Sequence, residues 1–111
     1  MRYKKLGRTG IEVSEYALGC WPFAGGDVWG DQSDETSIAA VHAALDAGIN
    51  FFDTAESYGD GRSERVLGVA LEGRRDEAVI ATKVSPSNLS RDGIVESCER
   101  SLRHLRIEYI D

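Results

Sequence analysis

The feature that most constrains the fold of this chain is a regular alternation between short apolar runs and longer stretches with helical periodicity. The apolar runs begin near four residues: Tyr16, Ile49, Ala78 and Ile107. The separation of each run from the next is about that of one strand and one helix. Because short buried strands alternate with amphipathic helices in parallel sheets, this spacing predicts a parallel sheet covered by helices.

The first predicted helix follows a loop at 21–33 that is rich in glycine and aromatic residues. Ser33 or Asp34 can cap the start of this helix, and Gly48 can end it. Its apolar face consists of residues at helical spacing: Ile38, Val41 and Leu45. The pattern therefore predicts an amphipathic helix that packs its apolar side against the sheet.

Two further helices are predicted, with Ser63 and Ser90 as their N-caps. The first of these ends near Gly73 and has four apolar residues on one side: Val66, Leu67, Ala70 and Leu71. The apolar face of the second is formed by Ile94, Cys98, Leu102 and Leu105. After it, the apolar run at 107–111 is expected to start another strand.

The chain begins with a predicted hairpin, in which 2–6 and 11–14 form strands around the turn residues at 7–10. The parallel strands that follow fit either an open doubly wound sheet or a (β/α)8 barrel. A barrel typically needs about 250 residues, so a chain of 111 residues can supply only its N-terminal hairpin and about its first half. No linker or low-complexity stretch divides the chain, so we expect residues 1–111 to belong to a single domain.

Composition excludes several classes of partner. A net charge of -6 and a pI of about 4.9 argue against nucleic acid or an anionic membrane, because surfaces that bind them concentrate positive charge. No apolar run approaches the ~20 residues that span a membrane, and no secretory signal follows the basic start, so we expect a cytoplasmic protein. Cys20 and Cys98 have no disulfide or zinc spacing and are expected to be buried free thiols.

Functional groups in folds of this kind gather at the carboxyl ends of the parallel strands. One strand leads to Cys20 and Trp21, the next ends on Asp53, and the third ends on Lys83. Tyr58 follows Asp53 in the loop before the second helix. Asp53, Tyr58 and Lys83 therefore come from two adjacent strand ends, and we expect them to converge.

The combined chemistry of these three side chains suits proton transfer to a carbonyl group. A phenol has a pKa of about 10 and is a poor proton donor near neutrality, but a contacting cation lowers that pKa by about 1–3 units. Lys83 can supply the cation, and Asp53 can hold the ammonium through a charge-assisted hydrogen bond. A tyrosine tuned in this way can protonate a carbonyl oxygen while hydride from a cofactor arrives at carbon.

Other interpretations of these residues exist. Taken singly, Asp53 is a turn residue, Tyr58 a packing residue and Lys83 a solvated cation. Asp53 with Glu56 and Asp60 offers hard oxygen ligands for a divalent metal, but no histidine joins them, and no metal is predicted. A Schiff base at Lys83 requires a depressed lysine pKa, whereas the nearby Asp53 would keep the amine charged.

The segment 59–64 also has the form of a glycine loop before a helix. Gly59 and Gly61 precede Ser63, as in loops that bind phosphate at a helix N-terminus. The third glycine of a dinucleotide-binding loop and the lysine of a P-loop are both missing, so this interpretation is weak.

Four motifs together resemble one family. FFDTAESYGDGRSE at 51–64 resembles the signature of the aldo-keto reductases. LGRTGIEVS at 6–14, with LGCW at 18–21, looks like that family's N-terminal hairpin and first barrel strand. VIATKVS at 79–85 resembles its lysine strand, and SCERSLRHLRIEYID at 97–111 resembles the helix and strand that lead to its histidine. The resemblance covers essentially the whole chain, in order and without large gaps.

This resemblance implies a (β/α)8 barrel, the TIM barrel, that reduces aldehydes or ketones with NADPH. On this match Asp53, Tyr58 and Lys83 take three places of the family's catalytic tetrad, with Tyr58 as the acid. Cys20 and Trp21 lie where the family's backbone and side chains meet the nicotinamide ribose and the substrate pocket. Asp53 also lies where the family contacts that ribose.

The fourth member of the tetrad, a histidine, is expected just beyond Asp111. His42 and His104 do not replace it, because both fall in predicted helices away from the strand ends. The family's pyrophosphate and 2′-phosphate contacts lie mostly in its second half. We therefore expect this chain alone to be inactive and to self-associate through its unpaired strand edges. Trp29 either lines the substrate pocket or lies against the barrel rim.

A second class of function fits the same fold. Potassium-channel β subunits resemble this family, and they bind the nucleotide while serving mainly as partners. The sequence GCWP at 19–22 suits such a cofactor-binding regulatory subunit as well as it suits an enzyme. No channel-docking surface is apparent in the sequence, so a reductase of small carbonyl compounds is the preferred prediction.

Overall fold

The predicted parallel strands form a three-stranded sheet in the computed structural model, which describes all of residues 1–111. The strands lie in the order β3 (Ala17–Gly19), β4 (Phe51–Asp53) and β5 (Val79–Ala81). The carboxyl ends of the three strands are level, because Gly19 pairs with Asp53 and Asp53 with Ala81. This register brings the loops that follow the three strands to one edge of the sheet.

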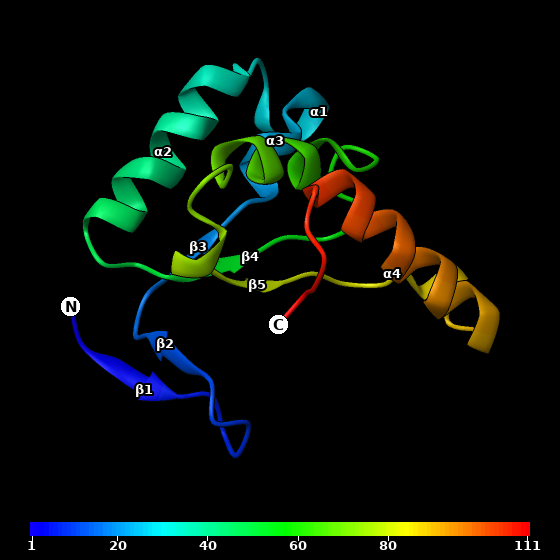
Figure 1. Cartoon of the computed structure of the whole chain (residues 1–111). Helices are drawn as coiled ribbons and strands as arrows, with labels where there is room; N and C mark the ends of the chain where they lie inside the picture. The colour runs from blue at the N-terminus through cyan, green and yellow to red at the C-terminus, as the bar shows by residue number, and fades with distance from the viewer.

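The predicted hairpin is formed by β1 (Tyr3–Lys5) and β2 (Glu12–Ser14), which pair antiparallel. The side chain of Asn50, just before β4, accepts a hydrogen bond from the backbone of Ser14 at 2.8 Å. The hairpin therefore lies beyond the amino ends of the parallel strands, away from the loops that carry the predicted site (Figure 1).

Two of the three predicted helix caps are confirmed. Helix α2 (Asp34–Asp46) begins after Ser33, whose hydroxyl accepts a hydrogen bond from the backbone N–H of Thr36 at 3.1 Å. Helix α4 (Arg91–Leu105) begins after Ser90, whose hydroxyl accepts from the N–H of Gly93 at 3.0 Å. Both bonds satisfy a donor that the first helical turn leaves free.

The cap predicted at Ser63 is wrong. Helix α3 (Arg62–Ala70) is capped by Gly61, which adopts the left-handed conformation with φ of 86°. Ser63 lies inside the first turn and is fully buried, where its hydroxyl donates to the carbonyl of Cys20 at 2.7 Å. The hydroxyl thus ties α3 to the end of β3 instead of capping its own helix.

The helices cover one face of the sheet, as Figure 1 shows for α2, α3 and α4. Phe52 and Ile80 point towards these helices and are fully buried, whereas their strand neighbours Phe51 and Val79 face the other side and are half-buried. This alternation follows from the two-residue period of a strand. The main core therefore lies between the sheet and the helices, and it includes side chains from all three helices: Val41, Leu45, Val66, Leu67 and Leu105.

The apolar face predicted for α4 is only partly correct. Leu105 is buried, but Ile94 is exposed, and Cys98, which was expected to be a buried thiol, is also exposed. The buried positions nearer the start of α4 are instead Ser97 and Ser101. Small residues suit this side of α4 because α3 and α4 approach closely, as the contact of Gly68 with the backbone of Leu105 shows.

Three other segments differ from expectation or add to it. The predicted loop at 21–33 contains two short helices, η1 (Trp21–Ala24) and α1 (Gly26–Trp29). Two more single turns, η2 (Arg75–Glu77) and η3 (Pro86–Asn88), flank β5 (Val79–Ala81). None of the helices combines the length and the apolarity that crossing a membrane requires.

Residues 107–111 do not form the predicted strand. The segment lies beside β5, but the N–H of Ile80 donates to the side-chain carboxylate of Asp111, at 3.0 Å, instead of to a backbone carbonyl. The same carboxylate pairs with Arg75 at 2.7 Å. A side chain therefore occupies a position that a backbone ladder would need.

Candidate active site

Three of the predicted site residues converge at the carboxyl edge of the sheet. The Lys83 ammonium donates to the carboxylate of Asp53 at 2.7 Å, to the carbonyl of Thr54 at 2.9 Å and to the hydroxyl of Tyr58 at 3.5 Å. An ammonium has three protons, so these three acceptors match its full capacity. The register of β4 and β5 makes this possible, because it brings the ends of both strands level.

The charge of Lys83 is set by its neighbours. Partial burial lowers the pKa of Lys83, but the hydrogen bond and the charge of Asp53 outweigh it, and Tyr58 adds to them, so that the pKa is raised. A protonated amine has no lone pair for attack on a carbonyl carbon. The arrangement therefore disfavours the Schiff-base interpretation.

The orientation of the Tyr58 proton follows from the same contacts. An ammonium can only donate hydrogen bonds, so the Tyr58 oxygen accepts the one from Lys83. The hydroxyl proton of Tyr58 is then free to point towards a ligand. The Asp53 and Lys83 side chains are 43% and 49% exposed, so the three residues lie at an open surface that a ligand can reach.

Two tryptophans lie beside Tyr58. The Trp21 ring stacks on the Tyr58 ring, with centroids 5.9 Å apart and planes 25° apart. Trp29 meets Trp21 edge to face at 5.4 Å. The two indoles are nearly half exposed, at 47% and 45%. Trp21, Trp29 and Tyr58 form what we call the aromatic wall, an accessible apolar surface next to the Tyr58 hydroxyl.

Cys20 is placed differently from Trp21. Its side chain is fully buried, and that burial, with the nearby charge of Asp53 acting in the same direction and Lys83 opposing it, raises the pKa of the thiol to about 12. The backbone of Cys20 is also engaged, since its N–H donates to Asp53 and its carbonyl accepts from Ser63. Only the family resemblance therefore supports the assignment of Cys20 to a cofactor site.

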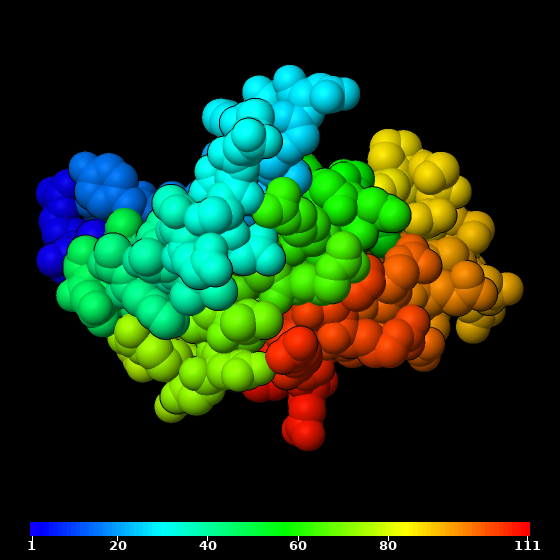
Figure 2. Space-filling model, turned by 90° about the horizontal axis from the view of Figure 1, so that it is seen from above, coloured from blue at the N-terminus to red at the C-terminus, as the bar shows by residue number.

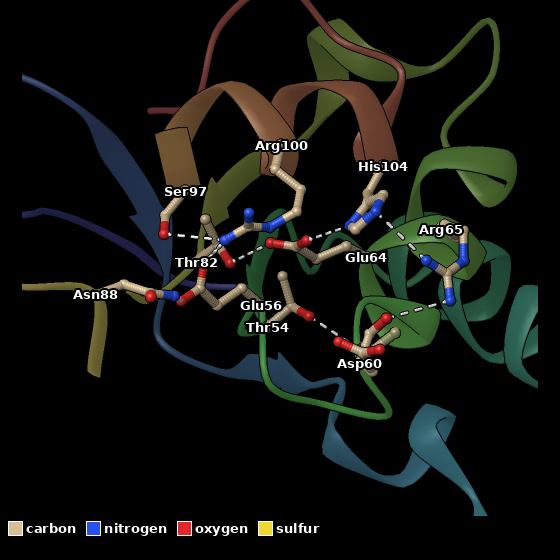
Figure 3. Close-up of polar contacts among 11 residues, drawn as sticks. Thr54, Glu56, Asp60, Glu64, Arg65, Thr82, Asn88, Ser97, Arg100 and His104 are labelled. Carbon is tan, nitrogen blue, oxygen red and sulfur yellow. Dashed lines mark hydrogen bonds and ion pairs between the residues drawn. The ribbon is translucent and has the colours of Figure 1, made fainter. Parts of the chain in front are cut away.

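Glu56 organises the loops around the site, a role that the sequence did not reveal. Its carboxylate accepts hydrogen bonds from the N–H of Ser85 at 2.7 Å and from the amide of Asn88 at 2.8 Å. Arg100 of α4 pairs with it at 3.3 Å (Figure 3). Burial alone would raise the pKa of Glu56, but the hydrogen bonds from Ser85 and Asn88 lower it to about 2. The only sequence signal was its position between Asp53 and Tyr58.

Neither alternative site gains support from the structure. Asp53, Glu56 and Asp60 do not gather into a group that could hold a metal ion. In the glycine segment, the N–H of Arg62 donates to the carbonyl of Gly59 at 3.1 Å, and other turn carbonyls engage the amides that follow. The amides of Arg62 and Ser63 are therefore engaged within the turn and are not free to bind a phosphate.

Both histidines bond within the helical layer, as expected. His42 lies 2.8 Å from the carbonyl oxygen of Ala70. His104 contacts the fully buried Glu64 at 3.1 Å, and the Thr82 hydroxyl donates to the other oxygen of that carboxylate at 2.7 Å (Figure 3). The bond of His42 joins α2 to α3, and the bonds to Glu64 join α3 to α4 and to the end of β5.

The fold and the site together define a class of protein. The model of the Aldo/keto reductase family matches residues 16–111, and the chain belongs to this family. It therefore contains the hairpin and part of the (β/α)8 barrel of that family, as the sequence predicted.

Individual relatives agree with this assignment. The chain is 41% identical to aldo-keto reductase YhdN of Bacillus subtilis (strain 168) and 38% identical to a probable voltage-gated potassium channel subunit beta of Oryza sativa subsp. japonica. Both comparisons cover 100% of the chain and 36% of the relative. The chain thus spans little more than a third of the length of these relatives.

Solved structures agree as well. The thermostable aldo-keto reductase Tm1743, in complex with the inhibitor epalrestat, superposes with a TM-score of 0.89 at 39% identity, covering 100% of this chain and 41% of that one. An aldo-keto reductase from Klebsiella pneumoniae, in complex with NADPH, gives a TM-score of 0.82 at 34% identity, covering 92% of this chain and 34% of that one.

Proposed function

We propose that the protein is an NADPH-dependent oxidoreductase that reduces aldehydes or ketones to alcohols, with Tyr58 as the general acid. The observation that carries this proposal is the contact of one ammonium, Lys83, with both Asp53 at 2.7 Å and the Tyr58 hydroxyl at 3.5 Å. Membership of the aldo/keto reductase family supports the reaction class, and the relative solved with NADPH supports the choice of cofactor.

In this mechanism the carbonyl oxygen of the substrate lies beside the Tyr58 hydroxyl. NADPH, when bound, supplies the hydride that adds to the carbonyl carbon. Tyr58 gives its proton to the oxygen, so the carbonyl gains a hydride and a proton and becomes an alcohol. The phenolate that remains is stabilised by the Lys83 ammonium, and Asp53 holds that ammonium in position.

The exposed groups of the site fit part of such a cofactor. Lys83 bonds to only one oxygen of the Asp53 carboxylate, Oδ1, so Oδ2 can accept from a ribose hydroxyl. The exposed indole of Trp21 offers an apolar surface at the same edge. We therefore assign Asp53 and Trp21 to the ribose and nicotinamide end of the cofactor site.

The proposal is tested by NADPH oxidation with nitrobenzaldehyde in the complete protein and in its Tyr58→Phe variant. Loss of the proton donor should lower kcat by at least about a hundredfold, since general acid catalysis contributes about 10²–10⁴. The matched control is Tyr16→Phe, because Tyr16 is an exposed tyrosine at 69%. Full activity in Tyr58→Phe would remove Tyr58 from the mechanism.

The second candidate function is a cofactor-binding regulatory subunit. The relative from Oryza sativa subsp. japonica, described as a probable potassium channel subunit beta, favours it. The two functions differ in a single measurement on the complete protein. NADPH binding with no turnover of any aldehyde would favour the regulatory subunit, whereas turnover that depends on Tyr58 would favour the reductase.

A further inference from the structure

The loop between β3 and α2, residues 21–33, carries both tryptophans of the aromatic wall. Figure 2 shows part of this loop, coloured blue to cyan, as a lobe that projects from the body of the molecule. Within the lobe, the N–H of Gly30 donates to the carbonyl of Gly26 at 2.7 Å and closes a tight turn around Trp29. A projecting lobe needs an anchor at its base if its side chains are to keep a fixed orientation.

One side chain, Arg62 of α3, provides that anchor. Its guanidinium donates to the carbonyl of Ala24 at 3.1 Å on one side of the lobe and to the carbonyl of Gln32 on the other. It also donates to the carboxylate of Asp34, at 2.9 Å from Nη2 and 3.3 Å from Nε. The rigid fork of arginine suits such a set of acceptors, because its separate nitrogens reach the two sides of the lobe, whereas a lysine offers a single nitrogen.

The fit around the guanidinium is tight. A Cβ atom added at Gly25 would lie 2.6 Å from the Nη1 atom of Arg62, and one added at Gly59 would lie 3.1 Å from the Cα of Ala24. Both glycines have positive φ, of 62° and 61°. The lobe, the guanidinium and the loop after β4 therefore pack in direct contact where a side chain would separate them.

The positions of the bonds connect Arg62 to the aromatic wall. Ala24 ends the short helix η1 that begins at Trp21, and Trp29 lies between the two bonded carbonyls of Ala24 and Gln32. Arg62 therefore fixes both ends of the segment that carries Trp29. Trp29 in turn packs on Trp21, and Trp21 stacks on Tyr58.

We propose that Arg62 is a positioning residue that holds the aromatic wall beside Tyr58 and thereby favours carbonyl substrates with a flat aromatic group over small aliphatic ones. This inference rests on the proposed reductase function. A flat ring gains from stacking only if the indole faces are held at a fixed orientation, whereas a small aliphatic aldehyde needs only the Tyr58 hydroxyl.

If Arg62 were purely structural, its loss would destabilise the fold and lower activity with all substrates equally. The proposal predicts a different outcome. The Arg62 and Asp34 side chains are 34% and 57% exposed, and exposed ion pairs contribute little to global stability. Loss of the guanidinium should therefore loosen the lobe while leaving the fold intact. The effect should fall on selectivity and not on all substrates equally.

The test compares Arg62→Met and Arg62→Lys with the unchanged complete protein, using nitrobenzaldehyde and propanal as substrates. For Arg62→Met, kcat/KM with nitrobenzaldehyde should fall about tenfold, equivalent to about 1.4 kcal/mol of binding, mainly through KM. With propanal it should change little, and Arg62→Lys should lie in between. The control is Arg106→Gln, which removes an exposed arginine that pairs with Glu72.

A second set of variants separates positioning from misfolding. If Arg62 acts through Trp29, loss of Arg62 should have no further effect once the Trp29 side chain is gone. The double variant Arg62→Met with Trp29→Ala should therefore discriminate between the two aldehydes as well as Trp29→Ala alone does. The near-ultraviolet circular dichroism of the tryptophan pair, measured without substrate, should weaken in Arg62→Met and persist in Arg106→Gln. That signal can be measured even if the unchanged protein turns over no aldehyde. A lack of turnover would contradict the proposed function without deciding the role of Arg62. An unaltered dichroism signal, or equal loss with both aldehydes, would overturn the role of Arg62.

Discussion

Glu56 joins three parts of the site through one carboxylate. It belongs to the loop that carries Tyr58, and it accepts hydrogen bonds from Ser85 and Asn88 in the loop after β5. Arg100 of α4 completes the set. Since Lys83 lies just beyond β5, in the same loop as Ser85 and Asn88, Glu56 ties the loop of Tyr58 to the loop of Lys83 without touching either of their side chains.

The variant Glu56→Gln should lower the free energy of unfolding at pH 7 by about 1–3 kcal/mol, because it removes the buried charge that accepts hydrogen bonds from three half-buried residues, Ser85, Asn88 and Arg100. The folded-state pKa of Glu56 is about 2, against an ordinary value of 4.5. A depressed folded pKa contributes stability that is fully present above the unfolded value and is lost as pH falls. The difference from the unchanged protein should therefore shrink as pH drops from about 5 towards 2.

Urea unfolding at several pH values measures this difference. Glu96→Gln is a suitable control, since Glu96 lies exposed on α4 and has no ion-pair partner in the chain. A gap that stays constant between neutral and acid pH would show that the Glu56 charge is not what stabilises the loops.

Single residues differ in how far their roles could be predicted. The convergence of Asp53, Tyr58 and Lys83 could be predicted because strand ends can be located from apolar runs, and parallel strands bring their ends together. Their catalytic roles are proposals. The roles of Ser63, Glu56 and Arg62 depend on partners distant in sequence, such as Cys20. No local pattern identifies those partners.

At the scale of elements, α3 and α4 meet at a glycine. A Cβ atom added at Gly68 would lie 2.5 Å from the carbonyl oxygen of Leu105, which is backbone and cannot rotate away. Gly68→Ala should therefore lower the free energy of unfolding by about 1–3 kcal/mol through overpacking. Thermal or urea unfolding checks this value. Val69→Ala, a neighbouring and partly exposed position, should change it by no more than about 0.5 kcal/mol.

A stabilising or neutral effect of Gly68→Ala would mean that the two helices can move apart without loss. Such a result would contradict the view that bonds such as that between His104 and Glu64 fix their separation. It would also weaken the link between this helical layer and the loops that hold the site.

The sequence predicted which elements form better than it predicted which face of a helix is buried. The caps at Ser33 and Ser90 were identified because a cap is a contact between neighbours in sequence. The inward face of α4 was not, because Ser97 and Ser101 are buried by contacts with distant elements, while Ile94 stays exposed. The spacing of apolar residues cannot reveal a buried helix face that is made of polar residues.

At the scale of the whole molecule, the chain forms two layers. Its extents are 38 × 37 × 24 Å, and its radius of gyration of 13.8 Å compares with about 13 Å for a compact domain of 100 residues. The helices cover one face of the sheet, while Phe51, Val79 and Ala81 on the other face are only half-buried. We propose that residues 1–111 act as part of one domain whose second sheet face requires a covering layer.

This open face leads to a prediction about the 111-residue polypeptide on its own. β3 and β5 each pair with one strand only, and the outer edge of β5 is covered in part by the side chain of Asp111. Both edges therefore lack a neighbouring strand next to a half-buried apolar face. The isolated polypeptide should therefore form dimers or larger species at concentrations of about 1–100 µM. Light scattering coupled to size exclusion measures this directly.

The variant Val79→Lys tests whether the open face drives the association. A charge on that face should shift the isolated polypeptide towards monomer, because burying a lysine between two copies is unfavourable. Val95→Lys places the same charge on the exposed side of α4 and should leave the association unchanged. A sharp monomer peak with cooperative melting in the unchanged polypeptide would mean that the two layers are stable without any partner. Equal effects of the two lysines would instead locate the contact elsewhere, in the edges or in the helices.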